Sequence, residues 1–320
     1  MIKILTFLFL ICYSLFVSAQ NINVSNTSDA TNFLGAYFSP FAESIGSGLN
    51  KGWYNTAKPH KLAGFDVSLS LNLITISDEV ASFDINSIEN FSSTSASTPS
   101  ILGSGDGATI NYQNGNVNGQ FVMPDQNIEI KAVPIPTLNV GLGLMKGTEI
   151  NVRYIPTYEY DIGFVGKGSV ELYGAGIKHD VLQWLPINKF LPFDLSIQGA
   201  FSQFNTSFEV ESQSVKQEVD LDIRASTVNL IFSKKFAMIT AFASLGQNFI
   251  NSILNANTNF SLGNTSTLNF DSPLQINIPN TSEMQASAGI RLQFAIFTLY
   301  ANQTFSSYPI TSVGIGASFR

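Results

Sequence analysis

The sequence predicts an all-β protein: a transmembrane antiparallel up-and-down β-barrel with an even number of strands, 10 to 14, and a short N-terminal helical plug or lid segment. Hydrophobic residues make up 44% of the chain and charged residues only 12%, against roughly 25% charged in soluble globular proteins. Beyond the N-terminus no apolar run approaches the ~18 residues that a spanning helix needs. Apolar and small polar residues instead alternate in runs of about ten, the length of a tilted membrane strand.

The first 19 residues have the pattern of a cleaved export signal. Lys3 gives a positive start, residues 4–16 are apolar, and Val17-Ser18-Ala19 supply small residues at the cleavage site. We therefore expect the mature chain to begin at Gln20. Cys12, the only cysteine, lies inside the apolar core, so we expect no disulfide, thiol nucleophile or thiolate metal ligand in the mature chain.

Residues 20–60 predict a helical plug or periplasmic segment that precedes a barrel of residues 61–320. Apolar residues recur there at helical spacing, and Ser39 followed by Pro40 has the pattern of a helix start. We expect two short amphipathic helices that meet at Ser39. Their apolar face must be buried in the lumen or under the periplasmic rim, and the sequence leaves both open. The candidate plug or gate residues are Phe33, Tyr37, Phe38 and Phe41.

Ten strands follow from period-two alternation of apolar and polar residues. Residues 65–73 illustrate the pattern, because Phe, Val and Leu occupy odd positions and Asp, Ser and Asn even ones. The expected strands are 62–77, 127–145, 149–162, 168–178, 193–205, 219–233, 236–249, 284–295, 297–306 and 310–319. Residues 79–91 and 107–123 would raise the number to twelve or fourteen if they add strands in pairs.

Connections of unequal length predict the orientation of the barrel, because outer-membrane barrels have short periplasmic turns and long extracellular loops. Tight turns are expected at 146–148, 233–235 and 295–297, and long polar loops at 78–126, 205–218 and 250–283. With strand direction alternating to the C-terminus, both termini are expected on the periplasmic side of a bacterial outer membrane.

Strand 219–233 does not keep one phase of alternation. Leu221 and Ile223 place the apolar face on odd positions, whereas Val228 and Leu230 place it on even ones. A β-bulge near 225–227 is one explanation. The favoured alternative is that residues 219–224 are extracellular strand beyond the membrane.

Charged residues within the expected strands fall on the polar side of the alternation. Asp66, Arg153 and Arg291 are therefore candidate lumen-facing polar residues. Trp184 lies in a short segment that leaves strand periodicity, and we expect it to anchor a periplasmic connection at the membrane interface.

The run Gly174–Pro186, together with the hairpin Leu138–Pro156, resembles a Bacteroidota outer-membrane β-barrel family of unannotated function that is distantly similar to FadL-like transporters. The resemblance implies a barrel with an N-terminal plug and a path for hydrophobic cargo. It also implies that the barrel assembly machinery recognises the last strand, which ends in the aromatic residue Phe319, during insertion.

Two functions remain open on the sequence. The first is passive transport of small hydrophobic molecules across the outer membrane; the alternative is a non-transporting barrel subunit or scaffold of a larger outer-membrane complex involved in secretion or assembly. The expected partners are outer-membrane lipid and proteins of such a complex.

We expect no enzyme activity, cofactor or metal, because His60 and His179 lack a partner set for catalysis or metal binding. Nucleic-acid binding is not expected, because the formal charge is −7 and no basic cluster occurs.

Overall fold

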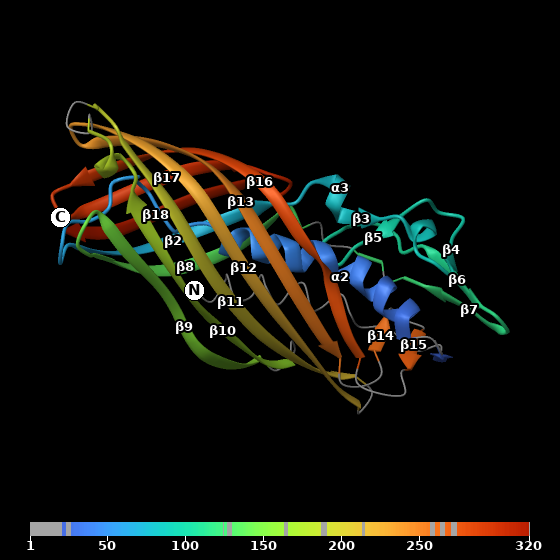
Figure 1. Ribbon diagram of the computed structural model, residues 1–320. Helices are drawn as coiled ribbons and strands as arrows, with labels where there is room; N and C mark the ends of the chain where they lie inside the picture. The colour runs from blue at the N-terminus through green and yellow to red at the C-terminus, as the bar shows by residue number, and fades with distance from the viewer. Residues whose placement is uncertain are drawn as a thin grey trace.

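A computed structural model shows a closed ten-stranded antiparallel barrel with a helix along its interior and a small β-rich cap at one end (Figure 1). The structure describes residues 21–23, 27–123, 125–126, 130–162, 166–186, 191–212, 215–256, 260–262, 266–269 and 274–319. The expected signal peptide 1–19, its cleavage before Gln20, and Arg320 lie outside the described residues. The fold class predicted from the sequence is confirmed.

Ten strands close the barrel, and their bounds follow the alternation closely. They are β2 (Phe65–Thr75), β8 (Ala132–Gly143), β9 (Thr148–Ile162), β10 (Gly166–Asp180), β11 (Asp194–Ser212), β12 (Val215–Phe236), β13 (Ile239–Ala256), β16 (Leu274–Phe294), β17 (Phe297–Phe305) and β18 (Ile310–Phe319). Neighbours in the chain pair with each other, and β18 pairs with β2 to close the ring.

The barrel wall is much taller on one side. Strands β11, β12, β13 and β16 have 18 to 22 residues, whereas β17, β18, β2 and β8 have 9 to 12. At about 3.3 Å per residue, the long strands are roughly 20 to 43 Å longer than the short ones. Much of the sequence expected as loops at 205–218 and 250–283 therefore belongs to strands. These polar stretches pair because strand hydrogen bonds satisfy the backbone whatever the side chains are.

Strand β12 settles the question of alternation phase. Its register with β11 and with β13 is continuous from Val219 to Phe236, with no bulge. Instead, Leu221 and Ile223 are buried on the inner face, and Val228 and Leu230 are exposed on the outer face. The possible β-bulge near 225–227 is therefore wrong, and the location of residues 219–224 beyond the membrane stays a prediction.

The long connection between β2 and β8 folds into the cap (Figure 1). It contains α3 (Asp78–Ala81), β3 (Ser82–Phe83), η1 (Ile85–Ser87), β4 (Phe91–Ser92), β5 (Thr98–Pro99), β6 (Thr109–Asn114) and β7 (Val117–Val122). The possible extra strands at 79–91 and 107–123 thus pair outside the barrel, as a three-stranded sheet β4-β6-β7 and the pair β3-β5. Most of their apolar residues, among them Ile85, Ile110 and Phe121, pack in a core with the helix.

The interior helix α2 (Thr27–Leu49) is continuous, so the expected pair of helices with a break at Ser39 is wrong. Pro40 lies within it and lacks the N–H that an α-helix uses. Both halves of the helix are held by contacts with the cap and with strands β2, β8, β12, β13 and β16. Across the described residues, no helix combines the length and the apolar character required to traverse a membrane.

The two ends of the barrel differ. One end, the short-turn end, carries the β8–β9, β12–β13 and β16–β17 turns and Phe319; the other, the cap end, carries the cap and the longest connections. The β12–β13 turn lies at residues 237–238, beyond the expected 233–235, because the ladder continues to the Phe236–Ile239 pair.

The expectation that both chain termini lie at one end does not hold for the described residues. Strand β1 (Asn21–Asn23) pairs with β15 (Ser266–Asn269) in the long β13–β16 connection, and α2 starts against the cap. Phe319 pairs with Phe65 at the short-turn end. The difference arises because α2 descends through the lumen from the cap end, and residues 50–64 then lead to β2.

Candidate functional site: the plugged lumen

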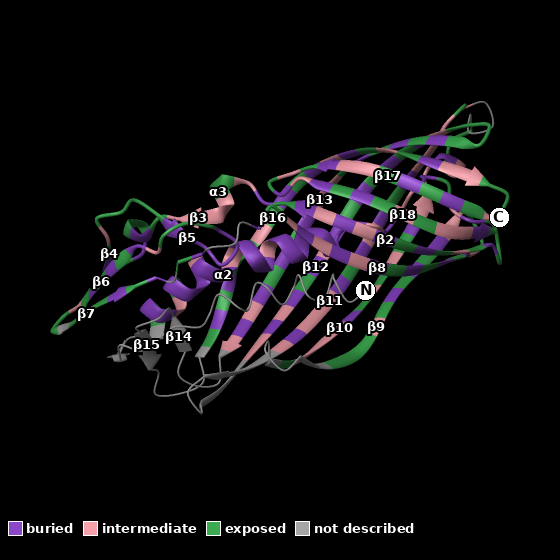
Figure 2. Cartoon of the chain, turned by 180° about the vertical axis from the view of Figure 1, so that it is seen from behind, coloured by how far each residue is buried: buried purple, intermediate pink, exposed green. Residues whose placement is uncertain are grey.

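The inner wall has two belts of different chemistry, and the burial pattern alternates accordingly along each strand (Figure 2). Toward the cap end the inward side chains are apolar and buried; they include Ile74, Val133, Ile135, Leu221, Ile223, Ile250, Ile276 and Ile310. Toward the short-turn end they are polar and buried; they include Ser70, Asn139, Asn151, Gln198, Asn229, Ser244 and Ser287. We call these the apolar belt and the polar belt.

Helix α2 packs closely against the side chains of the apolar belt. A Cβ added at Gly46 would lie 2.5 Å from Ile250, and one added at Gly48 would lie 2.7 Å from Ile74. Real Cβ atoms do not approach neighbours so closely, so these two glycines let the helix backbone pass next to the wall. Phe41, like its neighbours on α2, is buried. The helix therefore fills the apolar half of the lumen.

The first half of α2 completes the core of the cap. Phe33 is fully buried and stacks on Phe91 with ring centroids 4.8 Å apart, and it meets Phe83 and Phe121 edge-to-face. Tyr37 accepts a hydrogen bond from Gln126 at 3.2 Å. Aromatic contacts of this kind add about 0.5–1.5 kcal/mol each to the gain from burial. The helix and the cap consequently form one packed unit.

Asp29 ties the start of α2 to the cap by hydrogen bonds. Its carboxylate accepts from Asn90 at 3.0 Å, from the Tyr112 hydroxyl at 3.0 Å and from Asn114 at 2.8 Å. Burial raises the pKa of Tyr112, and the hydrogen bond to Asp29 raises it further. The phenol therefore stays protonated and continues to donate. A carboxylate near a helix N-terminus also interacts favourably with the helix dipole.

Arg153 of β9 holds the other end of the helix. Its Nη1 donates to the Leu49 carbonyl at 2.6 Å and its Nη2 to the Lys51 carbonyl at 2.7 Å, while Nε donates to Asn139 at 2.9 Å. The guanidinium also stacks over the Trp53 ring at 3.7 Å from its centroid. The last carbonyls of a helix lack intrahelical donors and carry partial negative charge. The guanidinium of Arg153 supplies both hydrogen-bond donors and a positive charge at this position.

Residues 50–64, which we call the connector, run from α2 through the polar belt. Gly52 has φ of 75°, and a Cβ there would lie 2.6 Å from the Ser70 hydroxyl, so only glycine suits this bend. Asn139 donates to the Gly52 carbonyl at 3.0 Å, and the Tyr54 hydroxyl bonds Ser244 at 2.5 Å. Backbone groups of the connector are thus satisfied by polar side chains of the wall.

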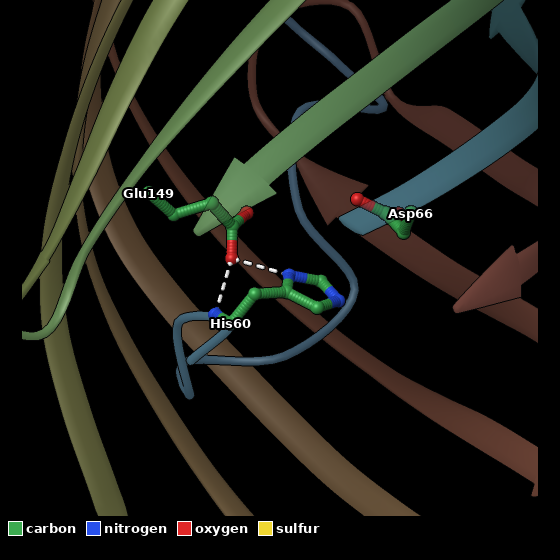
Figure 3. A group of neighbouring side chains, drawn as sticks. All are labelled: His60, Asp66 and Glu149. Atoms are coloured by element: carbon green, nitrogen blue, oxygen red, sulfur yellow. Dashed lines mark hydrogen bonds and ion pairs between the residues drawn. The ribbon is translucent and has the colours of Figure 1, made fainter. Parts of the chain in front are cut away.

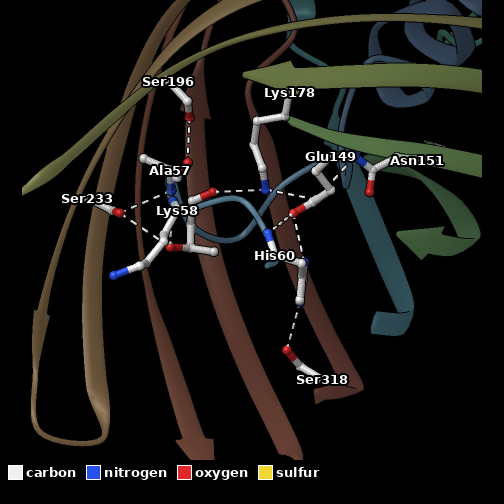
Figure 4. Close-up of polar contacts among 10 residues, drawn as sticks. Ala57, Lys58, His60, Glu149, Asn151, Lys178, Ser196, Ser233 and Ser318 are labelled. Carbon is white, nitrogen blue, oxygen red and sulfur yellow. Dashed lines mark hydrogen bonds and ion pairs between the residues drawn. The ribbon is translucent and has the colours of Figure 1, made fainter. Parts of the chain in front are cut away.

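The connector ends in a buried charged cluster near the short-turn end (Figures 3 and 4). Glu149 of β9 accepts from the His60 backbone N–H at 2.8 Å and pairs with its Nδ1 at 2.7 Å. Its other oxygen pairs with Lys178 Nζ at 2.9 Å, and His60 Nε2 bonds Ser318 at 3.0 Å. The imidazole therefore connects β9 to β18, two strands that are separated in the ring by β2 and β8.

His60, Asp66 and Glu149 offer ligand atoms within 4.8 Å of one another, a grouping that could hold a metal ion. The contacts within the cluster favour a structural role. Both oxygens of Glu149 and both nitrogens of His60 already have partners, and Lys178 compensates the carboxylate charge. A cation would have to displace an ammonium from a site that is buried. We therefore assign the cluster to anchoring the connector.

The structure buries most of the candidate residues. Phe33, Tyr37, Phe38 and Phe41 are all buried along α2. Arg153 and Arg291 are each 2% exposed on the inner wall, and Asp66 lies beside His60 and Glu149. Trp184 belongs to η2 (Leu182–Trp184) in the β10–β11 connection at the short-turn end, where it is 69% exposed and donates to His179.

Sequence reasoning missed Glu149, Lys178 and the contacts of His60. Glu149 and Lys178 lie on the polar phase of strands that were correctly expected, so the alternation alone places them inward. Their meeting with His60 depends on the path of the connector, for which the sequence has no local signal.

These features define the class of the protein: a transmembrane β-barrel whose lumen is filled by its own N-terminal helix and connector. The chain belongs to the family of unknown function DUF6588, whose model matches residues 1–319. No curated protein matches the chain.

Similar solved structures include several barrels. The β-domain of the Bordetella autotransporter BrkA has a TM-score of 0.40 and 10% identity over 80% of this chain and 99% of that one. The translocator domain of the autotransporter NalP from Neisseria meningitidis has a TM-score of 0.35 and 10% identity over 90% and 98%. The Pseudomonas putida toluene transporter TodX has a TM-score of 0.27 and 7% identity over 82% and 94%. No functional inference for this chain rests on these likenesses.

Proposed function

We propose that this protein is an outer-membrane barrel that its own N-terminal segment keeps closed and that holds the cap at the cell surface. In this proposal it serves as a non-transporting subunit or scaffold of a larger outer-membrane complex and has no catalytic activity. The single observation that carries the proposal is the filling of the lumen by α2 and the connector, whose central side chains Leu49, Trp53 and Ala57 are at most 3% exposed.

The outer face of the barrel supports a membrane location. Outward side chains around the short strands are apolar and exposed, for example Leu69, Val140, Val152 and Ile315. Water-exposed apolar surface of this extent is unfavourable, whereas the same surface in lipid costs nothing. With short turns expected on the periplasmic side, the cap lies outside the cell.

Closure of the lumen supports a scaffold role because the plug is fastened at both ends. The cap core and Asp29 hold the outer end of α2, and Arg153 and the His60 cluster hold its inner end and the connector. A gate would need to break one of these sets of buried bonds each time it opened. A permanently seated plug is more consistent with an anchor for the cap than with a conduit.

Conductance in planar lipid bilayers tests closure. We expect the purified full chain to give no stable channel steps, and a variant lacking residues 28–60 to give steps because both α2 and most of the connector are then removed from the lumen. Heat-dependent electrophoretic mobility checks that the deletion variant still forms a barrel. Stable conductance of the full chain would contradict the proposal.

Partner capture tests the scaffold role. After gentle detergent extraction, we expect the full chain to co-purify with one or more outer-membrane proteins in fixed stoichiometry. Recovery of the barrel only as a lone monomer, under conditions that preserve other outer-membrane complexes, would favour the second candidate.

The second candidate is passive transport of small hydrophobic molecules, as the FadL-like resemblance implies. The observation that favours it is the apolar belt, which would form a hydrophobic path if α2 moved. Uptake of a hydrophobic probe by cells with and without the gene separates the candidates: a transporter predicts lower uptake on deletion, and a scaffold predicts no change.

A further inference from the structure

The direction of α2 in the lumen has a consequence for the N-terminal end of the chain. The helix begins at Thr27 against the cap, and its last residue, Leu49, lies at Arg153 in the polar belt. The connector continues the same way to Phe65, where β2 starts at the short-turn end. Strand β1, the described segment that precedes α2, lies against β15 at the cap end, opposite to Phe319.

Two independent contacts fix this direction. The Asp29 carboxylate is bound by Asn90, Tyr112 and Asn114 of the cap. Strand β1 pairs in parallel with β15, in register from Asn21 with Thr267 to Asn23 with Asn269. The β15 segment lies in the connection between two of the long strands, at the cap end. Reversing the helix would break both sets of contacts and would separate Phe33 from the cap core.

We propose that the barrel carries the N-terminal end of its mature chain across the outer membrane and presents it at the cell surface beside the cap. This inference rests on the proposed orientation of the cap. It adds a display function: a segment joined ahead of β1 becomes a surface segment, although the barrel strands begin with Phe65 at the periplasmic side.

Single-cysteine labelling with a membrane-impermeant maleimide tests the proposal on intact cells. In a Cys12→Ser background the chain has no other cysteine. One variant carries a cysteine inserted directly ahead of Asn21, a second is Ser95→Cys in an exposed part of the cap, and a third is Met145→Cys, at a side chain 70% exposed at the short-turn end. Heat-dependent mobility confirms that each variant forms the barrel.

The expected result is that the inserted cysteine and Ser95→Cys are labelled on intact cells as completely as after permeabilisation, whereas Met145→Cys is labelled only after permeabilisation. Labelling of Ser95→Cys on intact cells without labelling of the inserted cysteine would overturn the inference and leave the proposed orientation standing. Labelling of Met145→Cys with protection of Ser95→Cys would overturn both.

Discussion

Replacing Arg153 by lysine should weaken the contacts that hold the end of α2 in the lumen, and the size of the loss follows from the contacts of Arg153. Arginine donates at once to the carbonyls of Leu49 and Lys51, which face it at 2.6 and 2.7 Å, and stacks on Trp53. A lysine ammonium has no planar fork, so it keeps at most one of the two carbonyl bonds and loses the stacking. Hydrogen bonds to charged groups contribute about 1.5–3 kcal/mol, and a buried cation–π contact about 0.5–2 kcal/mol. The expected loss is therefore about 2–5 kcal/mol.

Labelling of a buried cysteine on α2 measures this loss. Ser44 is fully buried, and its hydroxyl bonds only the Phe41 carbonyl of its own helix, so Ser44→Cys is a nearly isosteric probe. Reagent reaches the thiol only when the plug opens, and the labelling rate follows the open population. At about 1.4 kcal/mol per factor of ten, Arg153→Lys should raise the rate roughly 30-fold to 4,000-fold.

The matched control is Arg224→Lys, the same substitution at a side chain that is 53% exposed on β12 and pairs with Asp222 at 3.6 Å. Exposed ion pairs contribute about 0–1 kcal/mol, and this pair does not touch the plug, so the rate should not change. An unchanged labelling rate in Arg153→Lys, or an equal rise in Arg224→Lys, would refute the assignment of Arg153 as the inner clamp.

Two further substitutions test the apolar belt and the cap. Gly48→Ala should lower the stability of the barrel to urea in liposomes by up to about 2 kcal/mol, because overpacking outweighs the gain in helix propensity. Gly35→Ala, whose Cβ would lie an ordinary 3.7 Å from Ile276, should leave this stability unchanged or raise it by up to about 1 kcal/mol. A change in stability of the same sign in both variants would contradict the close packing of α2 at Gly48. Phe33→Ala should cost the cap about 3–5 kcal/mol and speed its cleavage by protease, whereas Phe305→Ala, at a side chain 62% exposed on the barrel wall, should leave cleavage of the cap unchanged.

The outward half of the barrel follows from the sequence by local rules. Every outward position of a membrane strand meets the same solvent, lipid, so the period of two in β2 or β18 identifies the strand without knowledge of its neighbours. The last two expected strands agree with the observed β17 and β18 to within a residue at either end. The polar phase likewise predicts that Arg153 points inward.

The inward half depends on what fills the lumen. Leu221 and Ile223 face inward because α2 passes there, and the same positions on a water-filled barrel would be polar. The apparent change of phase in β12 is therefore a change of inner environment from apolar belt to polar belt, with no irregularity in the backbone. Nothing within residues 219–233 encodes that difference, because the partner helix is almost two hundred residues earlier in the chain.

The sequence by itself determined the outer surface of this protein: a lipid-facing band, an even number of strands between ten and fourteen, and an amphipathic segment ahead of them. The tertiary structure alone decided that this segment is one helix across Pro40, that it runs inward from the cap end, and that residues 78–126 form a cap around its first half. The physical reason is that lipid acts on each strand separately, whereas the lumen is built from all strands at once. The position of the start of α2 is set by contacts such as Asp29 with Tyr112, which join residues far apart in the chain.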